Sequence, residues 1–493
     1  MTTVVTESAG RPSVPHIVRR RLATLENWLD PYSWLVTVVV TALAAVLRLE
    51  RITEAEGYVF DEVYYPTDAW DMLRHGVEWD EKSDSAGYVV HPPLGKWLIA
   101  AGEKIFGNNE LGWRFTAAVA GTLMVLILIR VAYRMFHSVV LAGTAGMLMT
   151  LDGFQFVLSR TSLLDIFLGL FVLATFAAMV LDRDHYRRRL LRAVGSGSTP
   201  RIVPWWLLVA GVMFGLACGV KWSALFFLPF FGALTVVWRV YARRSAGFTG
   251  GLAGDLGWGL LSVVLSVVLY LATWTGWFLT DTGWDRHYRA QNGMSEPPIL
   301  GALLNLLHYH QGAYGFHAGL TKSHNYQSWP WQWLLIGRPV AFYWPDDPGS
   351  GCGAPSCIRE ILLLGTPLLW WSFLPALVTL LWLAIARRDW RAYTILTGAA
   401  AGLLPWFYFA VADHRTMFSF YALPALPFLI LAVVHVLGAL IASPRGRLAG
   451  TLVAGVYVAL VALCFAYFHP IFTGELIPYD SWFSRMWLGN RWI

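Results

Sequence analysis

The sequence has few charged residues: Asp, Glu, Lys and Arg make up 14% of its 493 residues, against about 25% in ordinary soluble domains. Hydrophobic residues make up 56% of the chain and aromatic residues 15%. Apolar runs of about 17 to 25 residues, long enough to cross a bilayer, recur along most of the chain. The composition therefore excludes a soluble globular protein and predicts an all-α polytopic membrane protein.

Several common motifs are also absent. No Gly-x-x-x-x-Gly-Lys-Ser/Thr loop occurs, so the energy for any reaction must come from an activated substrate and not from ATP bound in such a loop. Neither His-Glu-x-x-His nor Cys-x-x-Cys spacing occurs, so we expect no metal site and no required cofactor. Residues 1–30 are polar and lack the cleavage site of a signal peptide, so we expect this tail to stay in the cytosol.

Cysteine is scarce, with four residues in the whole chain. Cys218 and Cys464 lie inside apolar runs and are expected to be buried, inert thiols. Cys352 and Cys357 lie in a polar loop rich in Gly, Pro and Ser. If this loop faces an oxidising compartment, a local disulfide is the expected state, with two free thiols as the alternative.

The apolar runs predict about eleven transmembrane helices. They are expected at 31–48, 111–134, 138–153, 162–181, 203–219, 221–240, 256–279, 361–385, 392–411, 417–441 and 449–468. This divides the chain into a cytosolic tail (1–30), a transmembrane domain (31–468) and a C-terminal tail (469–493).

The basic residues predict the orientation of these helices. With the N-terminus inside, the short pieces on the cytosolic side, from the N-terminal tail to the loop at 443–447, hold about 20 of the 37 Lys and Arg residues but only about 7 of the 31 acidic ones, as the positive-inside rule requires. Two large loops, 49–110 and 280–360, and the C-terminal tail then lie outside. We expect a multi-pass plasma-membrane protein. Because the Arg residues lie between apolar runs, the pI near 9.1 does not indicate a nucleic-acid partner.

The first outer loop contains two adjacent carboxylates, Asp61 and Glu62, in Tyr58-Val-Phe-Asp-Glu-Val-Tyr-Tyr65. Such a pair could simply form the first turn of a helix. Its aromatic setting at an outer membrane surface favours a second interpretation, in which a carboxylate of raised pKa acts as a general base on a substrate hydroxyl. The segment 93–106, apolar but interrupted by charges, predicts a helix along the interface.

Several charged residues near the outer ends of the predicted helices could bind the phosphate or sugar of a lipid-linked donor. A lone Arg at a helix end more often reaches to lipid headgroups. The candidates are His91, Lys96, Arg114, Asp152, Arg160, Asp165 and Arg415. Aromatic and hydrogen-bonding residues of the outer loops could equally bind a sugar or an acceptor peptide, or anchor the protein at the interface. These acceptor candidates are Tyr64, Tyr65, His324, Trp329 and Trp331.

The order of these motifs resembles that of the protein O-mannosyltransferases, which are glycosyltransferases of the GT-C architecture. The resemblance rests on Phe60-Asp-Glu-Val-Tyr-Tyr65, His91-Pro-Pro-Leu-Gly-Lys96, Arg114-Phe115, Leu151-Asp152 to Arg160, Leu164-Asp165, Ser328-Trp-Pro-Trp331 and the segment from Arg415 to Pro424. It covers about residues 45–440. Eukaryotic members carry a β-trefoil insert in the long outer loop, for which this loop is too short, so the chain resembles the actinobacterial branch.

The resemblance implies transfer of mannose from a polyprenyl-phosphate-mannose donor to Ser or Thr hydroxyls of unfolded, translocating proteins, with inversion and without a required metal. It makes Asp61 the catalytic aspartate, Glu62 its acidic neighbour and Arg114 a functionally important arginine. The secretion channel becomes a candidate partner. An inverting transfer needs one base, because polyprenyl phosphate leaves without protonation, and Arg114 or Arg415 would stabilise its charge.

Two alternatives remain open from the sequence. A related GT-C transferase could move an arabinose-type sugar from a polyprenyl phosphate to a lipid or glycan. A transporter or flippase of lipid-linked sugars would instead place ionisable residues near the bilayer midplane and show an inverted repeat. The outer location of the ionisable residues and the His-Pro-Pro-Leu-Gly-Lys element favour the mannosyltransferase.

Overall fold

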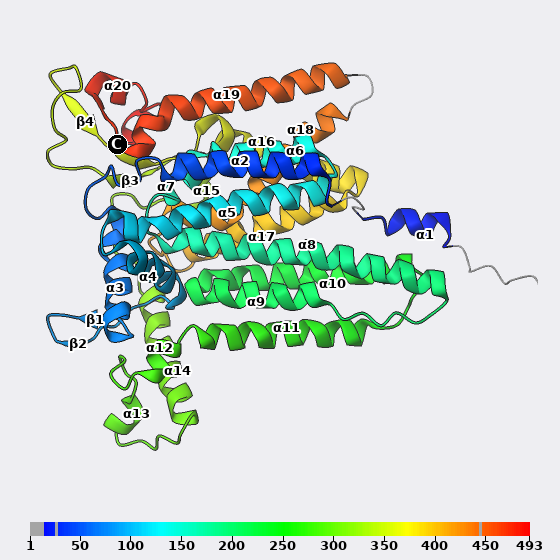
Figure 1. Ribbon diagram of the computed structural model, residues 1–493, viewed down its shortest axis with the longest axis horizontal. Helices are drawn as coiled ribbons and strands as arrows, with labels where there is room; N and C mark the ends of the chain where they lie inside the picture. Colours follow the sequence, from blue (N-terminus) through cyan, green and yellow to red (C-terminus); the bar gives the residue numbers. More distant parts are fainter. Residues whose placement is uncertain (1–13, 25–27, 443–445) are drawn as a thin grey trace, which may run out of the picture.

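The computed structural model describes residues 14–24, 28–442 and 446–493. Its long helices run side by side, and the short helices and strands gather at one end of the bundle (Figure 1). In this described part, nine helical segments are long and apolar enough to cross a membrane, and two further apolar helices are shorter. The eleven are α2 (Pro31–Leu49), α5 (Glu110–Phe136), α6 (Val139–Thr150), α8 (Leu164–Ser196), α9 (Trp205–Val220), α10 (Phe227–Ser245), α11 (Leu252–Ala272), α16 (Pro367–Arg387), α17 (Trp390–Val411), α18 (Leu426–Ile441) and α19 (Arg447–Thr473).

The remaining elements are short. They are α1 (His16–Arg21), η1 (Phe60–Val63), α3 (Tyr65–His75), β1 (Trp79–Asp80), β2 (Ser85–Ala86), α4 (Leu94–Phe106), α7 (Gly153–Leu158), η2 (Trp222–Phe226), α12 (Thr275–Leu279), α13 (Tyr288–Gln291), α14 (Leu300–Ala318), α15 (Pro330–Trp333), β3 (Val340–Tyr343), β4 (Cys357–Arg359), β5 (Ile361–Leu363), η3 (Ser419–Ala425), β6 (Leu476–Pro478), α20 (Tyr479–Phe483) and η4 (Gly489–Arg491). The strands form three antiparallel pairs, β1–β2, β3–β5 and β4–β6. The fold is otherwise helical, as predicted.

Most of the predicted helices agree with the structure within a few residues, and the helix expected at 93–106 is α4. Three boundaries were wrong. The helix predicted to end at 181 continues as α8 to Ser196, because Asp182 pairs with Arg239 of α10 and Asp184 with Arg134 of α5, which hold this part of α8 against its neighbours. The predicted helix 256–279 stops at Ala272, and α12 follows. Residues 361–363 form the strand β5, and α16 begins later, at Pro367, a residue suited to the first turn of a helix. Parts of the predicted tail 1–30 and of the loop 443–447 lie outside the described residues.

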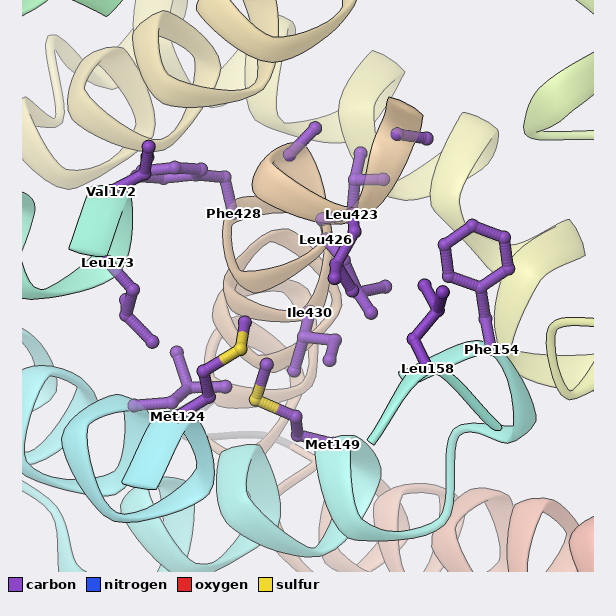
Figure 2. Close-up of a cluster of buried hydrophobic side chains, with 14 of the residues drawn as sticks. Met124, Met149, Phe154, Leu158, Val172, Leu173, Leu423, Leu426, Phe428 and Ile430 are labelled. Atoms are coloured by element: carbon purple, nitrogen blue, oxygen red, sulfur yellow. The ribbon is translucent and has the colours of Figure 1, made fainter. Parts of the chain in front are cut away.

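The core of the bundle is built around α18. A helix that is apolar on all sides is expected in a protein interior, and every residue from Leu426 to His435 is buried. Figure 2 shows Ile430 of α18 facing Met124 of α5 and Met149 of α6. By contrast, most residues of α11 are exposed in the structure, and only Asp255, Ser262 and Ser266 are buried, which suits a helix at the lipid-facing periphery.

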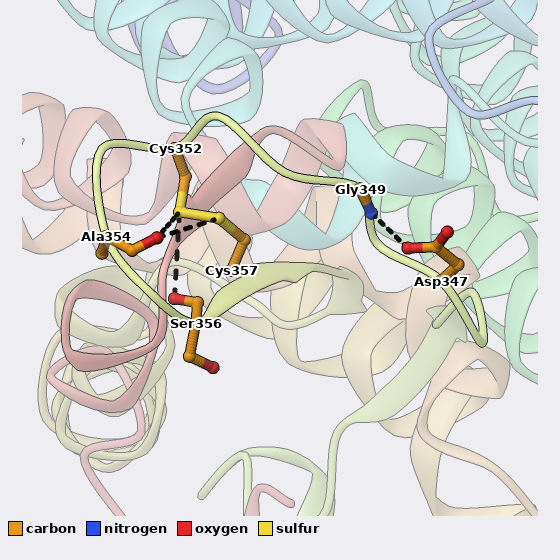
Figure 3. Close-up of a disulfide and its surroundings, with 6 residues drawn as sticks. All are labelled: Asp347, Gly349, Cys352, Ala354, Ser356 and Cys357. Atoms are coloured by element: carbon orange, nitrogen blue, oxygen red, sulfur yellow. Dashed lines mark hydrogen bonds between the residues drawn. A yellow bond between two sulfur atoms is a disulfide. The ribbon is translucent and has the colours of Figure 1, made fainter.

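The disulfide predicted between Cys352 and Cys357 is confirmed (Figure 3), with a Cα–Cα distance of 5.9 Å. It closes a short loop that leads directly into β4. Because β4 pairs with β6, the C-terminal segment is held against the second outer loop. The indole of Trp482 donates to the Glu360 carboxylate at 2.6 Å and strengthens this attachment.

The crossing of α4 and α5 gives a test of the fold. A Cβ at Gly102 would lie 2.2 Å from the backbone oxygen of Gly112, so we expect Gly102→Ala to separate the two helices and lower the melting temperature of the purified protein by several degrees. Gly232→Ala is the matched control, since nothing lies within 4 Å of its added Cβ and Ala favours a helix by about 1 kcal/mol. Equal melting temperatures for the two variants would contradict the packing.

Candidate active site

The turn that carries the two carboxylates has an unusual backbone. Phe60 adopts a positive φ of 51°, which is unfavourable for an aromatic residue by about 1–3 kcal/mol. Ring contacts hold it in place: Phe60 stacks on Phe342 at 4.7 Å and meets the edges of Phe418 and Phe420. This fixed turn determines where the next two side chains lie.

Glu62 is fully buried, and its carboxylate is saturated with donors. It accepts from its own turn at Val59 N (2.9 Å) and from Ser162 N (2.8 Å). The guanidinium of Arg114 binds both of its oxygens, with the shortest contact at 2.8 Å. Glu62 therefore joins the turn to α5 and to the start of α8.

Arg114 is equally occupied and lies in the interior, 1% exposed. Besides Glu62, it donates to the backbone oxygens of Ile52, Ala55 and Gly57 at 2.7–3.2 Å. These contacts account for all five of its N–H groups. Arg114 is predicted to bind phosphate, but in the structure its guanidinium instead holds residues 52–62 in place.

Asp61 is in the opposite situation from its neighbour. It is partly exposed, and within the described residues its carboxylate makes no hydrogen bond or ion pair. Burial raises the pKa of Asp61 to about 6, with Lys221 opposing the shift and Asp165 adding to it. An unengaged carboxylate with a pKa near neutrality is suited to accept a proton.

Lys221 and Asp165 form an ion pair beside Asp61, with Nζ 2.7 Å from Oδ2. Lys221 is the single residue with an extended backbone between α9 and η2. This break between the two helices places its ammonium at the site. The ring of Tyr421 lies 5.2 Å from this ammonium. Asp165 stands at the first turn of α8. The site therefore has a fixed positive charge near the carboxylate.

Arg415 completes the positive side of the site. Its Nε donates to the His317 oxygen at 3.1 Å, and its guanidinium lies over the rings of Trp406 and Tyr421. One of its terminal nitrogens is buried without a partner in the described structure. A buried unpaired N–H is unfavourable unless a ligand satisfies it, so this group is available to an anion.

His91 lies between these cations and the Asp61 turn. Its ring is 5.1 Å from that of His317 and 6.1 Å from that of Tyr65. Burial of the imidazole is the main cause that holds the pKa of His91 well below its usual value, and the positive charge of Lys221 is the next. His317 donates from Nε2 to the backbone oxygen of Val90 at 3.0 Å, while its Nδ1 is buried without a partner in the described structure. Two neutral imidazoles thus line the site.

Three other predicted donor ligands lie elsewhere. Asp152 caps α7 and binds Trp370 Nε1 at 2.7 Å, which ties α7 to α16. Arg160 binds the last carbonyls of α2 and the residues after it, including Glu50 O at 2.6 Å. Lys96 is buried and paired with Glu78 and, at 3.6 Å, with Asp68. Each has a structural partner set, in contrast to Asp61 and Arg415.

The predicted acceptor residues fall into two groups. Tyr64 is 63% exposed next to the turn, and burial raises the pKa of Tyr65 well above its usual value. His324 contacts Phe418, one of the rings around Phe60, at 5.1 Å. Trp329 and Trp331 stack on each other at 5.5 Å. Only the first three are linked to the Asp61 turn by described contacts.

Lys221 is a site residue that the sequence pattern does not predict, because it precedes an apolar run and is expected to be the first residue of a helix. A lysine between two apolar runs at a helix end is the available signal. His317 is likewise not distinguished by the sequence from the other His residues of α14. In the described part of the chain, no group of three His, Cys, Asp or Glu residues is arranged to hold a metal ion.

The contrast between the two carboxylates gives a stability test. Glu62→Gln should leave the buried Arg114 charge uncompensated, which costs about 3–5 kcal/mol for buried pairs, so the melting temperature should fall markedly. Asp61→Asn is the matched control and should melt at or above the temperature of the parent, because the Asp61 carboxylate has no partner to lose. Thermal unfolding in detergent measures both; an unchanged Glu62→Gln would contradict the assigned contacts.

Comparisons with known proteins identify the family of this chain. A family model described as dolichyl-phosphate-mannose-protein mannosyltransferase matches residues 38–280, and one described as the C-terminal four-TMM region of protein-O-mannosyltransferase matches residues 302–492. A polyprenol-phosphate-mannose–protein mannosyltransferase of Mycobacterium tuberculosis is 41% identical over 92% of this chain and 91% of its own. Its counterpart in Corynebacterium glutamicum is 35% identical over 93% of each chain.

Solved structures support the fold. The Pmt1-Pmt2 complex of Saccharomyces cerevisiae bound to the sugar donor superposes with a TM-score of 0.74 at 15% identity, covering 97% of this chain and 94% of that one. ArnT from Cupriavidus metallidurans superposes with a TM-score of 0.54 at 17% identity, covering 88% and 70%. At these identities the likeness concerns the fold alone, which is that of GT-C glycosyltransferases, as the sequence predicted. The chain is therefore a glycosyltransferase and belongs to the protein O-mannosyltransferase family, in its actinobacterial branch.

Proposed function

We propose that this protein transfers mannose from polyprenyl-phosphate-mannose to Ser or Thr hydroxyls of proteins, with inversion at the sugar. The names of the relatives at 35–41% identity support the donor and the protein acceptor. The observation that carries the mechanism is the unengaged Asp61 carboxylate of raised pKa beside the Lys221 cation, with Arg415 over the same Tyr421 ring as Lys221. Neither the arabinose-type transferase nor the flippase has comparable support.

Asp61 acts as the general base. It accepts the proton of the acceptor hydroxyl while the hydroxyl oxygen attacks the anomeric carbon, and the bond from that carbon to the phosphate oxygen breaks. Attack from the side opposite the leaving group inverts the anomeric centre. One carboxylate is sufficient, because the departing phosphate takes the bonding electrons and needs no proton.

The leaving phosphate is stabilised by Arg415 and Lys221. Arg415 has a buried N–H without a protein partner, and Lys221 adds a fixed charge at the same end of the bundle. Cations positioned in advance stabilise charge that develops in the transition state. His91 and His317, neutral because burial lowers their pKa values, offer hydrogen bonds to the sugar without adding charge.

Glu62 and Arg114 are positioning residues in this proposal. Both lie behind the turn and exhaust their hydrogen-bonding capacity on the protein. Their effect on the reaction is exerted through Phe60 and Asp61, which they fix. Asp152, Arg160 and Lys96 stabilise neighbouring helices through their own protein partners. We therefore do not propose them as ligands of the donor.

The acceptor reaches the site from the outer face. Exposed Tyr64 and the stacked Trp329 and Trp331 offer flat surfaces to an extended Ser/Thr-rich chain. The positive-inside bias supports a plasma-membrane protein with a cytosolic N-terminus and an outer C-terminus. Acceptors arriving unfolded from the secretion channel would suit this orientation.

The base assignment predicts that Asp61→Asn reduces transfer by orders of magnitude, because the amide cannot accept the hydroxyl proton. Membranes carrying the variant would be incubated with radiolabelled polyprenyl-phosphate-mannose and a Ser/Thr-rich peptide. Donor binding, followed by labelled donor retained on the purified protein, should persist. Normal labelling of the peptide by the variant would exclude Asp61 as the base.

The same assignment predicts a pH dependence. The base works only when ionised, so with a pKa of about 6 the initial rate should fall about tenfold per unit as the pH drops below 6 and level off above 7. Asp68 is the control, since burial also raises its pKa to about 6. Asp68→Asn should keep the midpoint of the pH–rate profile. Loss of that midpoint in Asp68→Asn, or a rate of the parent protein that stays constant down to pH 5, would contradict the assignment.

A further inference from the structure

A second polar site lies at the end of the bundle opposite Asp61. At 1.5 Å per residue, the 33 residues of α8 extend about 50 Å, whereas the hydrocarbon core of a bilayer is about 30 Å thick. α8 begins at Leu164, beside the site, and runs to the opposite end of the bundle (Figure 1). By length, its last turns therefore reach beyond the hydrocarbon core. The residues around Arg189 and Arg192 therefore lie at the depth of the lipid headgroups.

These last turns and the segment after them line an open cavity of about 410 Å3. Its polar lining consists of three arginines and three hydroxyl residues, with no acidic residue among them. They are Arg189, Arg192, Arg201, Ser196, Ser198 and Thr199. The hydroxyl groups of Ser196 and Ser198 lie 2.8 Å apart, within hydrogen-bond distance.

The three arginines differ from the others nearby. Arg183, Arg239 and Arg243 each bind a buried aspartate at 2.7–3.1 Å. The guanidinium groups of Arg189, Arg192 and Arg201, by contrast, make no hydrogen bond or ion pair within the described residues. The cavity therefore concentrates three positive charges that the fold leaves uncompensated.

The cavity has a folded base. Leu22, Tyr186, Leu190 and Ala242 form a small separate core that joins the segment after α1 to α8 and α10. Arg187 donates to the Arg21 oxygen at 3.4 Å, which brings the basic helix α1 to the same end of α8. Arg189, Arg192 and Arg201 are exposed on this base, so their guanidinium groups stand together at the surface and are open to a ligand.

We propose that this cavity binds a phosphate group, supplied in the membrane by the headgroup of an anionic phospholipid in the leaflet opposite the active site. Guanidinium groups match phosphate oxygens in pairs, and hydroxyl groups add further donors. Basic pockets at the ends of transmembrane helices recognise anionic lipid headgroups in this way. The depth of the cavity favours a lipid over a soluble anion.

The test compares two phosphate sources on the full-length protein purified in detergent. Phosphatidylglycerol should raise the melting temperature and remain bound in native mass spectrometry, whereas phosphatidylcholine, which has no net charge, should do neither. Inorganic phosphate should give a smaller shift, because it lacks the acyl chains. Phosphate acting as strongly as phosphatidylglycerol would reject the lipid as the source, and no effect of either would overturn the site.

The variant Arg189→Gln/Arg192→Gln/Arg201→Gln should bind phosphatidylglycerol about a hundredfold more weakly. Its matched control is Arg244→Gln/Arg387→Gln/Arg447→Gln, which removes the same charge from exposed positions outside the cavity. Equal loss in both variants would mean non-specific attraction and overturn the proposal. Melting without lipid reports folding, and because the readout is lipid binding, the result is independent of mannosyl transfer.

Discussion

The buried contact between Arg114 and Glu62 is the interaction on which the rest of the site depends. It joins residues 52–62 to α5 and, through Ser162, to the start of α8. Both groups are almost completely removed from water, so the pair is favourable only because every donor of the arginine is satisfied. The rigid turn that results is what holds Asp61 partly exposed and without a partner.

The two adjacent carboxylates therefore separate into different roles through their surroundings. Glu62 is surrounded by hydrogen-bond donors, whereas burial raises the pKa of Asp61 towards neutrality. The positive φ of Phe60 and the rings around it contribute to the same result from the other side. Desolvation and neighbouring charge of this kind adjust the pKa values of catalytic acids and bases, which is the basis for proposing Asp61 as the base.

Much of the architecture could be predicted from the sequence, because a transmembrane helix is specified locally by about 20 apolar residues. The strand at 361–363 and the extension of α8 could not, since a strand partner and buried ion pairs are tertiary features. For the site, the position of Asp61 in an aromatic outer loop indicated a candidate base, and the order of the motifs indicated the family. The partners of Arg114 and Arg160 are backbone oxygens, which carry no sequence signal, and Lys221 becomes part of the site only when α8 and α9 come together.

The position of α18 along the chain has a consequence for biosynthesis. This helix is buried on all sides, yet it begins only at Leu426. During synthesis, the helices formed from residues 31–411 must enter the membrane before their common centre exists, and their inner faces stay exposed to lipid or to insertion factors until α18 arrives. The late stage of insertion is therefore the point at which an incomplete chain is most vulnerable to membrane quality control.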